Sequence, residues 1–316
     1  MSLDRGLSII VCNYNSSLES VFLTLSSSLL QKDIPYEIIF CDDASKDNHK
    51  KEIVSFFKKH DFRDYKLCLS PNNSGTVINI LNGLHEAKYR YCKYIGSGDL
   101  FYDSHSLKDA VDFFEKNDCD FITAKCCYFY DVDGDIKTFN MANPVDYRPY
   151  EPNRYKPNKI KKRLLLDGDF CLGASIYAKT EVALNMLEHF RNKIIYSEDS
   201  ALIYECFKGS KIMYLNSYNV LYEYGSGIST NQNNSFLEKI RKDNLVAFNA
   251  VGELSLDKKA RKIYKKYQKL CNAGKLKKLI YNPSMYLLRN KRKHIKKDKP
   301  NLEFLKLCKE MSKHEL

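Results

Sequence analysis

Short apolar runs alternate with segments of helical periodicity along the first 126 residues. Five runs have the length and the aliphatic and aromatic character of strands, at residues 7–12, 36–41, 65–69, 91–95 and 120–126. Between them, apolar side chains recur at helical spacing in residues 18–30, 52–59, 77–88 and 106–116. Such β-α-β alternation predicts an α/β protein with a mostly parallel sheet, flanked by helices and connected by right-handed crossovers.

The second half of the chain repeats this alternation less regularly. Residues 140–157 are rich in Asn, Pro and Tyr, which is typical of an irregular loop. Strands are expected at residues 174–178, 211–215 and 220–224, and helices at 180–190 and 200–207. Beyond Ser235 the pattern is mainly helical, with breaks at Gly274 and Pro283. We therefore expect an α/β domain at residues 1–234 and a basic helical C-terminal extension at residues 235–316.

The positive charge of the chain is concentrated in that extension. The net charge is +12, yet residues 258–316 alone contain 20 Lys and Arg against 4 Asp and Glu. An enzyme of nucleic acids is expected to carry positive charge around its catalytic body as well, so nucleic acid is not an expected partner. A slightly acidic body with a basic tail favours docking on an anionic membrane surface. The alternative is a lysine-rich tail that only improves solubility.

The cysteines and the first residues bear on the cellular compartment. None of the eleven cysteines forms a CxxC pair, and most lie inside apolar runs, which favours reduced core thiols in a reducing compartment. The sequence begins without a basic, then apolar, leader, and no run of about 18 apolar residues follows. We expect a cytoplasmic protein, which the basic tail could bring to the inner face of the plasma membrane as a peripheral protein.

Three acidic clusters follow expected strands or precede an expected helix, and each has two interpretations. Ligands of parallel sheets bind at the carboxyl ends of the strands. Asp42 and Asp43 could there bind a pyrimidine N–H or a ribose hydroxyl, or one of them could cap the next helix. Asp99, in Ser97-Gly98-Asp99, could hold a hard divalent ion or be an ordinary turn residue. Asp199 could be a catalytic base or part of a helix N-terminus.

Several other patterns are set aside. The chain has no GxGxxG and no GxxxxGK[ST] motif, which argues against dinucleotide oxidoreductases and P-loop enzymes, and its seven histidines form no pair at metal-binding spacing. The sequence DVDGD at residues 131–135 predicts a hairpin turn rather than a calcium loop. The sequence Asp167-Gly168-Asp169 is interpreted as a turn.

The order of these segments resembles one family. The runs LSIIVCNYN, EIIFCDDASKDN, NNSGTVINILNGLHEAKYRYCKYIGSGDLFYDS and YSEDSALIYE together resemble family 2 glycosyltransferases of the GT-A fold, over about 230 residues. The resemblance implies a Rossmann-like GT-A domain that binds a nucleotide-sugar, with Asp43 reading the uracil edge. The other positions that it places near the nucleotide are Cys12, Tyr14, Asp42, Gly75 and Asn79.

The same resemblance assigns the reacting groups. Asp199 falls at the general base, and Asp99 falls at the last carboxylate of the metal-binding DXD motif, with Mg²⁺ or Mn²⁺ as the ion. Glu198 is assigned to positioning or acceptor contact, and Gly173 lies in the segment FCLGASIYA, which faces the acceptor in the family.

The metal motif departs from the family pattern. Where many members have D-x-D-D, this chain has Ser97-Gly98-Asp99-Leu100, which leaves one carboxylate. Asp103 or the later segment EYGSGIST at residues 223–230 are the candidates to supplement it. In that segment Gly225, Gly227 and Ser229 resemble a donor-side loop whose backbone N–H groups could bind phosphate.

The expected activity is therefore metal-dependent, inverting transfer of a sugar, most readily from a UDP-sugar. The acceptor would be a glycan or a lipid-linked glycan in surface-polysaccharide biosynthesis, such as lipopolysaccharide, O-antigen or capsule. Two alternatives are kept. A sugar nucleotidyltransferase would need a basic, glycine-rich loop after the first strand, where this chain has CNYNSSLES. A non-catalytic nucleotide-sugar or membrane-binding module would account for the missing carboxylate.

Overall fold

The computed structural model describes residues 4–132, 135–139, 143–225, 234–292 and 300–315. In these residues one sheet contains nine strands: β1 (Asp4–Asn13), β2 (Tyr36–Asp42), β3 (Tyr65–Leu69), β4 (Tyr89–Gly96), β5 (Leu100–Phe101), β6 (Phe121–Val132), β7 (Asp135–Phe139), β8 (Ile176–Lys179) and β9 (Ile212–Glu223). Its strand order is β3-β2-β1-β4-β8-β6-β9-β5, and β7 pairs with the outer part of β6.

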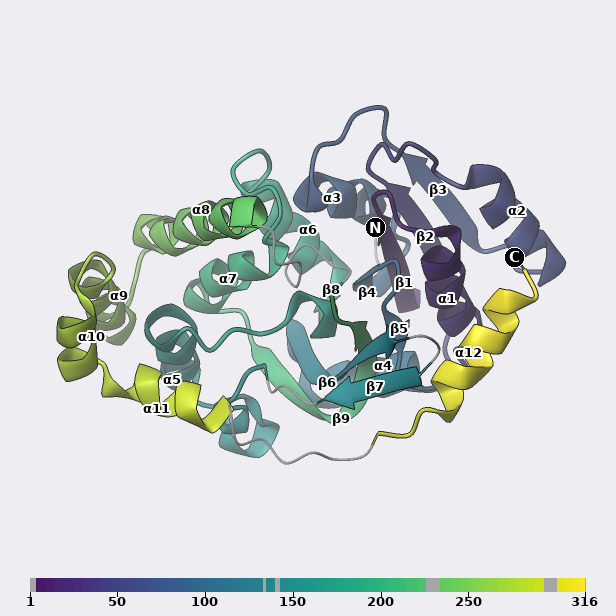
Figure 1. Cartoon of the computed structure of the whole chain (residues 1–316). Coiled ribbons are helices and arrows are strands. Elements are labelled where there is room, and N and C mark those ends of the chain that lie inside the picture. Colours follow the sequence, from purple (N-terminus) through teal and green to yellow (C-terminus); the bar gives the residue numbers. More distant parts are fainter. Residues whose placement is uncertain (1–3, 133–134, 140–142, 226–233, 293–299, 316) are drawn as a thin grey trace.

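Helices cover both faces of this sheet (Figure 1). The α-helices of the described residues are α1 (Leu18–Leu29), α2 (Lys50–Lys59), α3 (Thr76–Glu86), α4 (Ser106–Asn117), α5 (Pro157–Lys162), α6 (Thr180–His189), α7 (Leu202–Lys208), α8 (Asn234–Ala250), α9 (Lys258–Leu270), α10 (Lys275–Tyr281), α11 (Pro283–Arg292) and α12 (Glu303–Lys313). Short 3-10 turns precede β8, at Gly173–Ser175, and α7, at Glu198–Ala201.

The first half of the sheet is parallel, as the sequence predicts. β1 pairs in parallel with β2 and β4, and β2 pairs in parallel with β3. Successive side chains of a strand point to opposite faces, so Ile9 and Val11 enter the core beneath α1, α2 and α4, while Ile10 enters the core beneath α3 and α6. Because both faces are covered, these strands are apolar throughout, which is why they are recognisable in the sequence.

The second half of the sheet is mixed, and one prediction for it is wrong. β8 is antiparallel to β4 and β6, whereas β9 is parallel to β6. Residues 211–215 and 220–224 were expected to form two strands, but β9 is a single strand with irregular register opposite Lys125. The polar residues between the two apolar runs do not break the strand because Asn219 is buried and donates to the Ser106 carbonyl at 2.9 Å.

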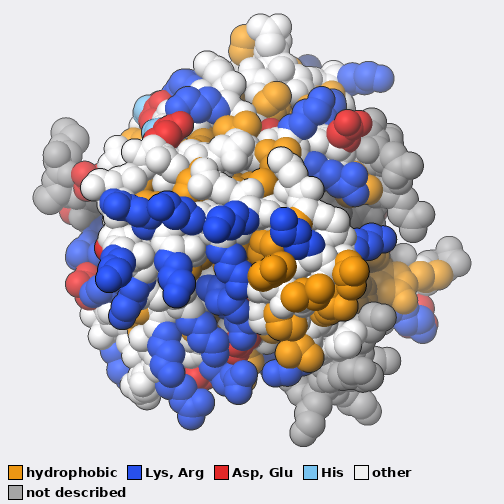
Figure 2. All heavy atoms as spheres, turned by 90° about the vertical axis from the view of Figure 1, so that its left-hand side faces the viewer, with side chains coloured by type: hydrophobic (Ala, Val, Ile, Leu, Met, Phe, Trp, Pro, Cys, Tyr) orange, Lys and Arg blue, Asp and Glu red, His pale blue; other side chains and the backbone are white. Residues whose placement is uncertain are grey.

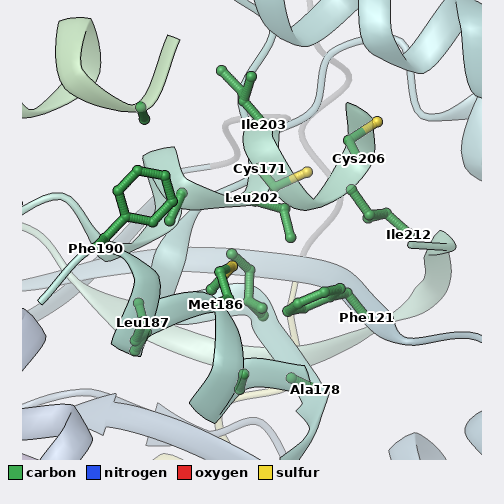
Figure 3. Close-up of a cluster of buried hydrophobic side chains, with 14 of the residues drawn as sticks. Phe121, Cys171, Ala178, Met186, Leu187, Phe190, Leu202, Ile203, Cys206 and Ile212 are labelled. Carbon is green, nitrogen blue, oxygen red and sulfur yellow. The ribbon is translucent and has the colours of Figure 1, made fainter. Parts of the chain in front are cut away.

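One part of the hydrophobic core anchors the segment after the third acidic cluster. Figure 3 shows side chains of α6 and α7 converging with residues of β6, β8 and β9. Leu202 and Ile203, directly after the Glu198–Ala201 turn, are 1% exposed and pack in the same cluster as Phe121. The C-terminal side of that turn is therefore held by the core.

The helices of the C-terminal extension lie at two opposite sides of the molecule, with α8 to α11 on one side and α12 on the other (Figure 1). α8 and α9 add Ala247, Val251 and Tyr267 to the core that α6 and α7 share. α12 instead packs against α1, where Leu305 and Cys308 are fully buried. The division at residue 234 stays a prediction.

All eleven cysteines are free thiols. Among the described residues, no helix has the length and hydrophobicity needed to cross a bilayer.

Candidate active site

The ends of β1, β2 and β4 bring the first two acidic clusters to one edge of the sheet. Asn13 at the end of β1 lies opposite Asp42 at the end of β2. The Asp43 N–H donates to the Asn13 carbonyl at 3.0 Å, and the Ser97 N–H donates to the Cys12 carbonyl at 3.0 Å. The loops that follow the three strands are therefore connected directly to β1.

Asp42 is bound entirely by neighbouring polar groups. Its buried carboxylate accepts hydrogen bonds from the Asn13 amide at 2.7 Å, the Ser45 N–H at 2.9 Å and the Ser45 hydroxyl at 2.5 Å. Neither Asp42 nor Asp43 caps the next helix, because His49 occupies the N-cap position of α2. The capping interpretation of this cluster is wrong. Asp42 instead stabilises the loop that follows β2.

Asp43 shapes the loop that leads into α3. Its two carboxylate oxygens accept the N–H groups of Ser74 and Gly75, each at 2.8 Å. Gly75 has a φ of 88°, and a β-carbon there would lie 2.3 Å from the Ile195 side chain, so only glycine fits. Asn79, one turn into α3, donates to the Cys41 carbonyl at 3.0 Å. The predicted nucleotide residues Asp43, Gly75 and Asn79 thus share one small region.

Cys12 and Tyr14 flank the same edge in different environments. Tyr14 is 50% exposed and lies just beyond the end of β1. Burial raises the pKa of the Cys12 thiol, and the nearby Glu198 carboxylate raises it further, against the opposing effect of Lys93. The Cys12 side chain therefore lies between the predicted nucleotide residues and the third acidic cluster.

Asp99 gains a second carboxylate as a neighbour from the distant strand β9. The Glu223 N–H donates to Asp99 Oδ1 at 2.9 Å, and a β-carbon on Gly98 would lie 2.2 Å from Glu223 Oε2. Burial raises the pKa of Asp99 to about 7, although the Glu223 N–H lowers it. Glu223 is the first residue of EYGSGIST, so the described start of that segment lies beside the predicted metal motif. Asp103 accepts N–H and hydroxyl groups of His105 and Ser106 at the start of α4 instead.

A buried lysine lies between the clusters and has no sequence signature. Lys93 on β4 is fully buried, and its ammonium donates to the carbonyls of Tyr94 at 2.8 Å and Ala174 at 2.6 Å. Burial lowers its pKa to about 8, while the charges of Asp99 and Glu198 act against that shift. Lys93 supplies positive charge near both carboxylates, and it holds the turn that carries Gly173.

Glu198 and Asp199 form a half-buried carboxylate pair beside Gly173. A β-carbon on Gly173 would lie 2.3 Å from Glu198 Oε1 and 3.5 Å from Asp199 Cβ. Burial raises the pKa of Asp199 to about 6, opposed by the N–H groups of Ser200 and Gly173. Burial, followed by repulsion from Asp199, raises the pKa of Glu198 further. Asp199 therefore ionises first, and the pair tends to retain one proton near neutral pH.

Asp199 lies at a helix N-terminus, as one of its two interpretations expected, in the first turn of the Glu198–Ala201 segment that leads into α7. Ser197 is the N-cap residue of the Glu198–Ala201 turn and makes no side-chain capping bond. The segment is instead held by Asp243 of α8, whose Oδ2 accepts the N–H groups of Ile195, Tyr196 and Ser197 at 3.2, 2.7 and 3.1 Å. Asp243 had no signature in the sequence, because one acidic residue in a charged helix is unremarkable.

The remaining predicted positions are Gly225, Gly227 and Ser229, which follow Glu223 in the chain, and the Asp167-Gly168-Asp169 turn. Gly225 has a φ of 105° just after β9, and Gly227 and Ser229 lie outside the described residues. Asp167 pairs with Arg163 at 2.6 Å, and Asp169 accepts the N–H groups of Val145 and Asp146. These two carboxylates have structural partners within the fold. In the described parts of the chain, no three His, Cys, Asp or Glu side chains form a group suited to a metal ion.

A family comparison accounts for this arrangement. The model of glycosyl transferase family 2 matches residues 8–180, more than half of the chain. The chain belongs to glycosyl transferase family 2. The match begins in β1 and ends at the first residue of α6, so it includes the predicted nucleotide residues and Asp99 but not Glu198 and Asp199.

Two curated relatives match shorter segments. Poly-beta-1,6-N-acetyl-D-glucosamine synthase of Staphylococcus epidermidis is 33% identical over 113 residues, which are 36% of this chain and 26% of that protein. Dolichyl-phosphate beta-glucosyltransferase of Dictyostelium discoideum is 28% identical over 151 residues, which are 45% of this chain and 46% of that protein. The matches thus span about a quarter of the first relative and less than half of the second.

Solved structures extend the fold comparison beyond the family match. S. aureus TarS is similar with a TM-score of 0.58 and 20% identity over 83% of this chain and 43% of that one. TarS 1–349 in complex with UDP has a TM-score of 0.56 and 15% identity, over 98% of this chain and 92% of that one. At these identities the likeness concerns the fold, and it confirms the expected GT-A architecture.

Proposed function

We propose that this protein transfers a sugar from a UDP-sugar to a hydroxyl group of a glycan or lipid-linked acceptor, with inversion, in surface-polysaccharide biosynthesis. One observation carries the proposal. In a family 2 chain, the carboxylate pair Glu198–Asp199 lies near Cys12 and Lys93, beside the edge formed by Asp43 and Asp99. A base and a donor site would thereby meet at one edge of the sheet.

The proposed chemistry uses the ionised Asp199 as the general base. Asp199 accepts the proton of the acceptor hydroxyl while that oxygen forms a bond to the anomeric carbon. The bond from the anomeric carbon to the diphosphate oxygen breaks, and UDP leaves with the electron pair. Glu198 and Gly173 would contact the acceptor, since both lie directly beside Asp199. The protonated Glu198 can donate a hydrogen bond without adding negative charge near the base.

The donor is proposed from the edge of the sheet that carries Asp43 and from the ligands and products of similar proteins. One TarS 1–349 structure, which has a TM-score of 0.56 and 20% identity over 83% of this chain and 71% of that one, contains UDP-GlcNAc, and another contains UDP. The S. epidermidis relative is named as a synthase of a polymer of N-acetylglucosamine. UDP-GlcNAc is therefore the first donor to test, with Asp43 and Tyr14 at the base and Gly225, Gly227 and Ser229 on the phosphate side.

A divalent ion is proposed at Asp99. Asp99 accepts the Glu223 N–H, and the Glu223 carboxylate lies beside Gly98. Hard oxygen ligands of this kind suit Mg²⁺ or Mn²⁺, which complete their coordination with water and phosphate oxygens. Such an ion would neutralise charge on the departing diphosphate. Glu223 would thus supply the acidic group that Ser97-Gly98-Asp99 lacks.

The two domains expected from the sequence enter this proposal with separate roles. Residues 1–234 would bind the donor and catalyse transfer, and the basic extension would bring the enzyme to an anionic membrane surface. A lipid-linked acceptor would be reached most easily from such a surface.

The experiment measures UDP release from a panel of UDP-sugars with Mn²⁺ or Mg²⁺, together with thermal stabilisation by each donor. Ligand binding raises the melting temperature by mass action, whether or not turnover follows. We expect stabilisation and steady UDP release with at least one donor. Stabilisation without release would favour the non-catalytic module, and the lack of any response to all UDP-sugars would refute the proposal.

A further inference from the structure

α10 and the start of α11 present apolar side chains to solvent. Leu276, Ile280 and Leu287 are 71%, 64% and 64% exposed, and Tyr281 and Leu279 are 59% and 45% exposed. α10 has no buried residue, although it contains three aliphatic side chains within seven residues. Folding does not account for these positions, because a helix normally turns its apolar side chains toward the core. We call Leu276, Leu279, Ile280, Tyr281 and Leu287 the apolar patch.

Basic side chains surround the apolar patch. α9 buries Ala260, Tyr267 and Leu270 on one face, and four exposed lysines recur at helical spacing on the other, at Lys258, Lys262, Lys265 and Lys269. Residues 258–292 contain 13 Lys and Arg and no Asp or Glu. Figure 2 shows orange side chains gathered beside a broad blue field on this side of the molecule.

Only one kind of partner suits both features. A polyanion such as nucleic acid would pair with the lysines but leave the apolar patch in water. A second copy of this chain would bring two strongly positive faces together, and like charges repel. A bilayer that contains anionic lipids offers phosphate groups to the lysines and an apolar interior to leucine and isoleucine side chains just below them.

We propose that α9, α10 and α11 form a membrane-docking surface, with the apolar patch entering the lipid interface and the α9 lysines contacting anionic headgroups. The proposal deepens the proposed function, on which it rests for the lipid-linked acceptor. Leu245 of α8 lies at the edge of an apolar groove of about 240 Å³ that α9, α10 and α11 also line. α8 also contains Asp243, which accepts the Tyr196 N–H just before Glu198. Docking would therefore hold the proposed active site close to the lipid surface.

The docking surface includes only part of the C-terminal extension. Other apolar residues of α9 and α11 do not belong to it, because Tyr267, Leu270 and Leu288 are buried and Ile263 is partly buried. α12 belongs to the packing of α1 rather than to the docking surface. Deletion of residues 258–316 would therefore damage the fold, and point substitutions on exposed side chains are the sound test.

The test is sedimentation of the full chain with vesicles of phosphatidylcholine alone or mixed with phosphatidylglycerol. We expect binding to the mixed vesicles that weakens as salt is raised. The double variant Leu276→Ser with Ile280→Ser, and separately Lys262→Glu with Lys265→Glu, should each weaken binding at least ~10-fold, because each exposed group adds to partition into the interface. Melting temperature and UDP release should stay unchanged in both variants.

Two matched control variants test whether vesicle binding depends on α9 and α10 rather than on charge or exposed leucine anywhere on the protein. Lys50→Glu with Lys51→Glu changes the net charge equally on exposed residues of α2, and Leu307→Ser removes an exposed leucine of α12. Both controls should bind vesicles as the unmodified protein does. The proposal is overturned if the unmodified protein ignores phosphatidylglycerol at low salt, if the controls lose as much binding, or if the patch variants instead abolish a dimer seen by light scattering. Because vesicle binding needs no turnover, its result is independent of whether the proposed transfer occurs.

Discussion

Asp243 offers the sharpest test of how the fold builds the active site. It lies on α8, 6% exposed, and one of its oxygens accepts three consecutive backbone N–H groups just before Glu198. Ile195, the first of the three, also accepts the Val77 N–H of α3 at 3.1 Å and covers Gly75. Substitution of Asp243 therefore acts on the segment that joins the donor side to the proposed base.

The magnitude follows from which N–H groups would lose their partner. Ile195 is exposed, so water can replace the carboxylate there, whereas Ser197 is buried and Tyr196 is partly buried. A buried donor without a partner costs about 1–3 kcal/mol, so Asp243→Ala should lower the free energy of unfolding by about 2–4 kcal/mol. Asp243→Asn retains an oxygen acceptor but loses its charge, and should cost roughly half as much.

Activity is the readout that separates positioning from mere stabilisation. A displacement of 1 Å in a reacting group can cost about 10²-fold in rate, so we expect kcat to fall ~10–100-fold in Asp243→Asn at temperatures where the variant stays folded. The charge of Asp243 also contributes to the raised pKa of Glu198, after burial and Asp199. Its removal should lower that pKa and shift the pH–rate profile toward acid.

The assay compares kcat, KM for the donor, melting temperature and pH profile across a small series. Asp243→Glu should restore part of the activity, and Glu238→Gln, which removes an exposed charge from the same helix, should resemble the unmodified enzyme. If Asp243→Asn keeps its kcat and pH profile and loses only melting temperature, α8 stabilises the fold without positioning the Glu198–Ala201 turn.

The remaining predictions concern the other carboxylates. Asp199→Asn should reduce transfer at least ~10²-fold with UDP affinity unchanged, and the unmodified enzyme should lose activity as pH falls below about 6, where the raised pKa of Asp199 leaves the base protonated; an unaltered pH–rate profile in an active Asp199→Asn enzyme would reject the base. Asp43→Ala should weaken UDP binding by about 1.5–3 kcal/mol in calorimetric titration, since a charged acceptor is lost. Asp99→Ala should abolish the increase in UDP affinity that Mn²⁺ gives, and Glu223→Gln should reduce it. If both variants keep the full increase, the proposed position of the ion is wrong.

The parallel half of the sheet could be predicted because its signals are local. Strands covered on both faces must be apolar over their whole length, and the helices between them repeat at a fixed period. The acidic clusters at the ends of β2 and β4 could be located for the same reason, since a strand end and the loop after it are adjacent in sequence. In the mixed half, β9 continues through polar residues because Asn219 finds partners in α4 and β8.

The partners of those clusters were decided by tertiary structure. Glu223 reaches Asp99 across 124 positions of the chain, and Asp243 holds a segment 46 to 48 positions away. In the sequence, Lys93 is one polar residue in an apolar strand. Only the structure shows that its ammonium is buried, donates to two backbone carbonyls and lies near both Asp99 and Glu198. A sequence pattern records what a residue needs from its immediate neighbours. A charge that is balanced or a loop that is held by a residue far along the chain leaves no such pattern, because its energy depends on distance in space.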